Sequence, residues 1–235
     1  MLLMMLSLIV SYAPITILYI YLRNLRKQDE GYRSDCKSLL IKGILCCLGV
    51  TALDLILTII LNLIGIKDAH PLIKVLIKAF VIAAFAEELV KYLTVNKVIK
   101  KNTGNISWFD CIAFSTIVGI GFQIIETIVY LVESNVGQII VRGLLMGHPT
   151  YGMLMGYFIG KSLYTKNDSF RILALLWPML LHGLYDFSLA DELMKVNDNF
   201  VFLPFIILGI GFIIFIRIIL LIRKERNGGE FTKPL

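Results

Sequence analysis

Seven long apolar stretches, separated by short polar segments, divide the chain along its whole length. As a helix that rises about 1.5 Å per residue, each stretch can cross the roughly 30 Å hydrocarbon core of a bilayer. The predicted spans are 1–22, 38–65, 72–97, 108–132, 138–160, 171–190 and 200–222. The pattern therefore predicts an all-α, polytopic transmembrane bundle that forms one integral membrane domain, 1–235, in the cell membrane.

The first stretch is predicted to be a helix of the bundle and not a signal peptide. It has no basic start, and no pair of small residues suited to cleavage follows it. Composition agrees with a membrane protein, since 57% of the residues are hydrophobic, only 17% are charged and the mean hydropathy is +0.80. A soluble domain would be about half apolar with about a quarter of its residues charged.

Basic residues concentrate in alternate loops, and this pattern predicts the orientation of the chain. The loops after the first, third and fifth spans, together with the tail, hold most of them, whereas the other loops hold only Lys67 and Lys195. Lysine and arginine favour the cytoplasmic side, so the N-terminus is expected outside and the C-terminus in the cytoplasm. Orientation also explains the net charge of +6 without a nucleic-acid partner. The lipid bilayer is the expected surrounding.

Several ionisable residues interrupt the apolar spans. Because such a group at the bilayer centre costs about 2.5–3.5 kcal/mol, a span that keeps one is expected to use it. Glu87, Glu88, His148 and His182 lie near the middle of their spans. Glu126 and Asp186 lie about one turn further out, so these six side chains are predicted to meet in one layer. The residues considered are Asp54, Glu87, Glu88, Lys91, Glu126, His148, His182 and Asp186.

Helical spacing assigns faces to these residues. Glu87 and Lys91 are four residues apart and share a face, so an ion pair is expected between them, whereas Glu88 points about 100° away and has no such partner on its helix. His182 and Asp186 are also four apart, so the acid can orient the imidazole or share a water or metal with it. His148 heads a row of glycines expected to pack closely in the bundle.

These side chains suit the hydrolysis of an amide. That reaction needs an activated water, a base, an acid for the leaving nitrogen and stabilisation of the oxyanion. A glutamate can act as the base, and histidines can donate to the oxyanion or hold a metal. Glutamate and histidine are ligands of zinc, although the chain lacks the H-E-x-x-H spacing.

Four segments resemble, in order, the motifs of the PrsW family of intramembrane proteases, which is related to the CAAX-prenyl-protease superfamily. AEELVKY at 86–92 is similar to its E-E-x-x-K motif, and GFQIIETIVYL at 121–131 is similar to its F-x-x-x-E segment. GHPTYGMLMGYFIGK at 147–161 resembles its glycine-rich histidine segment, and LLHGLYDF at 180–187 resembles its H-G-x-x-D segment. One departure is Thr127, where the family often has asparagine.

The resemblance implies an intramembrane endopeptidase with catalytic core helices over 70–190. Its expected substrate is a single-span membrane protein such as an anti-sigma factor. A divalent metal such as zinc is a candidate cofactor. Glu87 and Glu88 match the essential pair of the family, with His182 and His148 completing the catalytic set. Supporting roles are expected for Glu126, Asp186 and Lys91, and the candidate metal ligands are His148, His182 and Glu126.

Other interpretations of the same residues stay open. Acids and histidines at mid-depth also build proton- or cation-coupled transporters, and a relative of the family can be a non-catalytic membrane partner. Glu126 can instead reach Arg142, Asp186 can serve as a cap near the outer surface, and Asp54 can make a structural polar contact. The sequence does not specify the oligomeric state.

Overall fold

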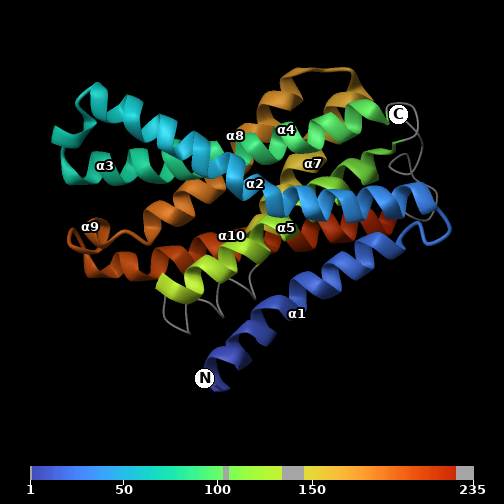
Figure 1. Ribbon diagram of the computed structural model, residues 1–235, viewed down its shortest axis with the longest axis horizontal. Coiled ribbons are helices and arrows are strands. Elements are labelled where there is room, and N and C mark those ends of the chain that lie inside the picture. Colours follow the sequence, from blue (N-terminus) through green and yellow to red (C-terminus); the bar gives the residue numbers. More distant parts are fainter. Residues whose placement is uncertain (1, 103–105, 134–145, 226–235) are drawn as a thin grey trace.

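Helices form all the regular elements that the computed structural model describes, which covers residues 2–102, 106–133 and 146–225 (Figure 1). The predicted all-α class is thus confirmed. The long helices are α1 (Leu2–Asn24), α2 (Glu30–Leu63), α4 (Ala86–Lys101), α5 (Trp108–Glu133), α7 (Gly147–Thr165), α8 (Ser169–Ser188) and α10 (Leu203–Glu225). Shorter elements are η1 (Ile66–Asp68), α3 (Pro71–Ile77), η2 (Lys78–Phe85), α9 (Asp191–Met194) and η3 (Asp198–Phe202).

Four helical segments in the described residues are long and apolar enough to cross a membrane by themselves. They are Leu6–Asn24, Glu30–Leu63, Trp108–Tyr130 and Asp198–Leu221. Within the described ranges, each of the seven predicted stretches contains a long helix. The number of spans and the orientation of the termini remain predictions.

Helix α5 is the centre of the bundle, and most of its apolar length is buried (Figure 1). It packs against α7 on one side and α2 on another, and glycines set both distances. A Cβ atom on Gly152 or Gly156 of α7 would collide with the backbone of α5, and a Cβ on Gly43 of α2 would do the same. The row of glycines therefore brings α5 and α7 into direct backbone contact, as small residues do between membrane helices.

Helices α3 and α4 form one continuous rod that contains a π-helical segment, η2, between them. The joining residues Lys78 and Ala86 keep right-handed helical angles, so the rod does not break. The sequence predicted a regular helix over 72–97 here. A π turn adds a residue to the backbone ring without disturbing hydropathy, so the apolar pattern does not reveal it. The segment ends at Phe85, two residues before Glu87.

Polar contacts at one end of α5 fix its start and its position against α1. Ser107 and Asp110 cap each other reciprocally, since Asp110 Oδ2 accepts from the Ser107 nitrogen at 2.7 Å and the Asp110 nitrogen donates to Ser107 Oγ at 3.2 Å. Arg26, which follows α1, donates to the same Asp110 oxygen at 2.7 Å. The buried carboxylate thus ties the first helix to the central one.

The close contact between α5 and α7 predicts a strong effect of a single methyl group. Replacing Gly156 with alanine would place a Cβ 2.6 Å from Ile112 Cα, so the helices must separate. We expect Gly156→Ala to lower the free energy of unfolding by about 1–3 kcal/mol, measured by thermal unfolding in detergent. Gly209→Ala on α10 is the control, because a Cβ there meets no atom within 4 Å. Equal melting temperatures for the two variants would contradict the packing argument.

Candidate active site

Helix α4 contributes two glutamates and a lysine from its first two turns. Lys91 Nζ lies 3.2 Å from Glu87 Oε2, which is the expected pair, but it also lies 2.9 Å from Glu88 Oε1. The expectation that Glu88 has no partner on its own helix is therefore wrong. A residue three positions away is as much a helical neighbour as one four positions away, and the flexible lysine reaches both.

The same ammonium also contacts α7. Lys91 Nζ lies 3.0 Å from His148 Nδ1, so its three N–H groups have three acceptors in Glu87, Glu88 and His148. Lys91 is only 2% exposed and Glu88 is completely buried. A buried ammonium is tolerated when its charge is paired and its hydrogens are bonded, and this arrangement meets both conditions.

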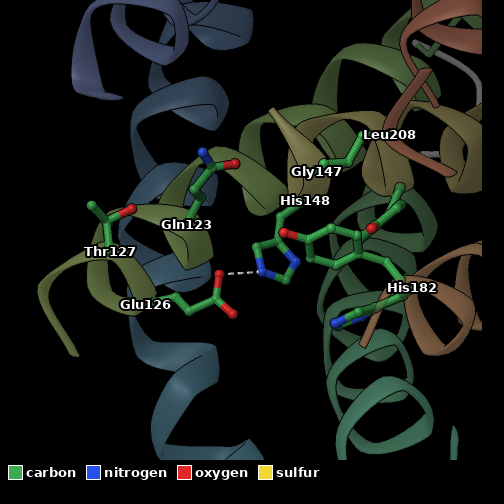
Figure 2. Close-up of a pocket in the computed structure, with 9 residues that line it drawn as sticks. Gln123, Glu126, Thr127, Gly147, His148, His182 and Leu208 are labelled. Carbon is green, nitrogen blue, oxygen red and sulfur yellow. Dashed lines mark hydrogen bonds and ion pairs between the residues drawn. The ribbon is translucent and has the colours of Figure 1, made fainter. Parts of the chain in front are cut away.

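The hydrogen bonds fix the tautomer of His148. An ammonium can only donate, so Nδ1 accepts from Lys91 and Nε2 carries the ring hydrogen. That hydrogen points to Glu126 on α5, whose Oε2 lies 2.5 Å from His148 Nε2 (Figure 2). His148 is therefore held from both sides, by a cation on α4 and a carboxylate on α5. Helix α7 begins at Gly147, directly before this residue.

His182 on α8 faces carboxylates with both ring nitrogens. Its Nδ1 lies 3.1 Å from Glu88 Oε1, and its Nε2 lies 3.3 Å from Asp186 Oδ2 and 4.0 Å from Glu87 Oε2. The centroids of the two imidazole rings are 5.1 Å apart. The structure therefore brings together side chains that are 94 residues apart in the chain, as their shared depth predicted.

Aromatic rings enclose these polar groups. Phe122 lies under the Lys91 ammonium at 4.0 Å from the ring centroid, and Tyr151 stacks on His182 at a centroid distance of 5.0 Å. A pocket beside the cluster is lined by Gln123, Glu126, Thr127, Gly147, His148, Tyr151, His182, Tyr185 and Leu208 (Figure 2). Sequence reasoning did not assign Gln123, Tyr151 or Tyr185 to the site. The sequence could have indicated Tyr151 as a site residue, because it lies three residues after His148 on the same helical face.

The cluster also fits the donor set of a divalent metal. In the described part of the chain, one ligand atom from each of Glu87, Glu88, His148 and His182 lies within 4.8 Å of the others. Zinc accepts carboxylate oxygens and imidazole nitrogens. Glu88 Oε2 is buried and has no hydrogen-bond partner among the described residues, so one more lone-pair donor points into the interior. The expected ligand Glu126 lies outside this group of four and instead bonds to His148.

Two further residues considered from the sequence are Asp54 and Arg142. Asp54 on α2 is partly buried and is not a member of the group of four. Arg142, the alternative partner of Glu126, lies outside the described residues.

Comparisons with known proteins agree on one family. The model of the PrsW family of intramembrane metalloproteases matches residues 37–220, which include every residue of the cluster. A protein named protease PrsW from Halalkalibacterium halodurans is 32% identical over 136 residues, and its namesake from Bacillus subtilis is 30% identical over 134 residues. These matches cover 56% and 55% of this chain, and 62% and 60% of the two relatives. No solved structure matches the chain.

The unequal burial of the two glutamates predicts unequal losses of stability. Glu88→Gln removes the buried carboxylate that Lys91 and His182 share, and breaking a buried ion pair typically costs about 3–5 kcal/mol. Glu87 keeps 13% of its side chain exposed, so Glu87→Gln should cost clearly less. Thermal unfolding of both variants in detergent measures the difference. A larger loss for Glu87→Gln would contradict the assignment of Glu88 as the main buried counter-ion.

Proposed function

Since this chain belongs to the PrsW family of intramembrane metalloproteases, we propose that it is an endopeptidase that hydrolyses a peptide bond of a membrane-anchored protein. The observation that carries the proposal is the largely buried group of two carboxylates and two imidazoles, contributed by α4, α7 and α8, whose ligand atoms lie within 4.8 Å of one another. Such a group supplies a base and hydrogen-bond donors in an interior where electrostatic interactions are strong.

We assign the base to Glu87. Its Oε2 lies 4.0 Å from His182 Nε2, a distance that one water molecule can bridge. Part of its side chain is exposed, whereas Glu88 is completely enclosed, so Glu87 is the better placed of the two to meet a water molecule. Glu88 then serves as the anchor that positions Lys91 and His182.

The proposed reaction balances within the cluster. Glu87 takes one proton from the water, and the resulting hydroxide adds to the carbonyl carbon of the substrate. The proton then passes to the amide nitrogen, the C–N bond breaks, and an amine and a carboxylic acid are released. His182 donates through Nδ1 to Glu88, and when Nε2 also carries a hydrogen, that N–H lies 3.3 Å from Asp186 and can be given to the oxyanion instead.

The family description also implies a metal. A divalent ion such as zinc, held by Glu87, Glu88, His148 and His182, would supply Lewis-acid activation of the water and the carbonyl. Asp186 and Glu126 would then orient the two imidazoles through their other ring nitrogens.

The proposed substrate is a single-span membrane protein such as an anti-sigma factor. The pocket combines polar groups with Tyr151, Tyr185 and Leu208, which suits a segment that carries both a peptide backbone and apolar side chains. Because the site lies inside a bundle of apolar helices, the cut is expected within or next to the membrane part of the substrate.

Co-expression with a panel of tagged single-span anti-sigma factors tests the proposal. The wild type should release a fragment whose mass gives the cut position, and Glu87→Gln should reduce its yield at least about 100-fold, because the swap removes the base while keeping the shape. Glu30→Gln, an exposed change in the first turn of α2, is the matched control and should cleave like the wild type.

The assignment fails if Glu87→Gln cleaves as fast as the Glu30→Gln control. A fragment that also appears in cells without the protein would show that another protease makes it. A wild-type enzyme that cleaves no member of the panel, in cells or after reconstitution into liposomes, would contradict the proposed substrate class.

A further inference from the structure

The Lys91 ammonium lies among the four candidate metal ligands, Glu87, Glu88, His148 and His182. Three of those four residues contact Nζ directly: Glu88 through Oε1 at 2.9 Å, His148 through Nδ1 at 3.0 Å and Glu87 through Oε2 at 3.2 Å. The face of the Phe122 ring also borders this cation site, with its centroid 4.0 Å from the nitrogen. These groups therefore form a site suited to a cation, and the Lys91 ammonium already occupies it.

His148 cannot serve Lys91 and a metal at the same time. An imidazole nitrogen has one lone pair, and that of Nδ1 accepts a hydrogen from Lys91, while Nε2 donates to Glu126. As long as both bonds persist, the ring has no free lone pair. A dication beside the ammonium would also be repelled strongly, because little water screens charges in this buried cluster.

Glu126, the other partner of His148, favours metal binding by this ring once the ammonium leaves. Glu126 keeps the hydrogen on Nε2, which leaves Nδ1 as the lone pair that faces the cluster. A carboxylate that accepts from the far nitrogen of an imidazole is the usual support of a metal-bound histidine. Only the cation at Nδ1 has to be exchanged, and the ring need not turn.

We propose that Lys91 and a divalent metal occupy the cluster alternately, with Lys91 as the internal cation that holds Glu87, Glu88 and His148 together in the metal-free protein. The inference rests on the proposed function only in treating this cluster as the reacting site. It predicts that loss of the ammonium improves metal binding, which is the opposite of the effect expected if Lys91 supports a bound metal.

Zinc binding to the purified full chain in detergent tests this proposal. Equilibrium dialysis against a zinc buffer, with metal content measured by mass spectrometry, gives the affinity of each variant without any substrate. Lys91→Met removes the charge and keeps most of the side-chain length, and we expect at least about tenfold tighter binding than in the wild type. Lys78→Met, on the exposed side of the same helical rod, is the control and should bind like the wild type.

Unchanged or weaker binding by a folded Lys91→Met protein would overturn the proposal, and so would a failure of every variant to bind zinc. A second measurement needs no variant that might misfold. In wild-type protein labelled with ¹⁵N-lysine, assigned against Lys91→Arg, saturating zinc should shift or remove the ammonium signal of Lys91. An unshifted signal with zinc bound would also overturn it.

The two proposals can fail separately. If the wild type cleaved in the presence of a chelator and bound no zinc, Glu87 would stand as the base. The proposed exchange of cations would be contradicted. Tighter zinc binding by Lys91→Met without any cleavage would support the exchange and contradict the protease.

Discussion

The need to neutralise a buried ammonium organises this site. Lys91 has no access to water that could solvate its charge, so it must find acceptors within the protein. It finds two carboxylates on its own helix and an imidazole on α7, and the carboxylate of Glu88 continues the network to His182 on α8. One charge therefore links three helices, and loss of any partner leaves a buried polar group that nothing else can satisfy.

The network closes only because the helices approach unusually closely. A Cβ on Gly119 would collide with the backbone carbonyl of His148, so this glycine lets the start of α7 lie directly on α5. That approach places His148 within hydrogen-bond distance of Glu126, while Gly152 and Gly156 hold the following turns of α7 at the same short separation. Packing and chemistry are thus coupled, since the glycines that shape the bundle also set the length of the Glu126–His148 bond.

Much of this arrangement follows from the sequence. Apolar length predicted the helices, depth predicted the layer that holds Glu87, Glu88, His148 and His182, and helical spacing predicted the contact between His182 and Asp186. Spacing alone does not reveal distances between helices, so the bonds of Lys91 to His148 and of Glu126 to His148 were missed. The π-helical segment was also missed, because hydropathy does not register a single extra residue in a turn.

The unequal roles of the two glutamates have a simple geometric origin. Adjacent residues on a helix point about 100° apart, so they cannot face the same neighbour in the same way. Lys91 stands four residues after Glu87 and three after Glu88, which places its ammonium between them. One ammonium contacts both carboxylates, yet only Glu88 is turned into the interior toward His182. Glu87 remains at the edge, near both imidazoles and partly exposed. Two acids followed by a lysine at this spacing here give one enclosed carboxylate and one partly exposed carboxylate, which is the division that the proposed hydrolysis uses.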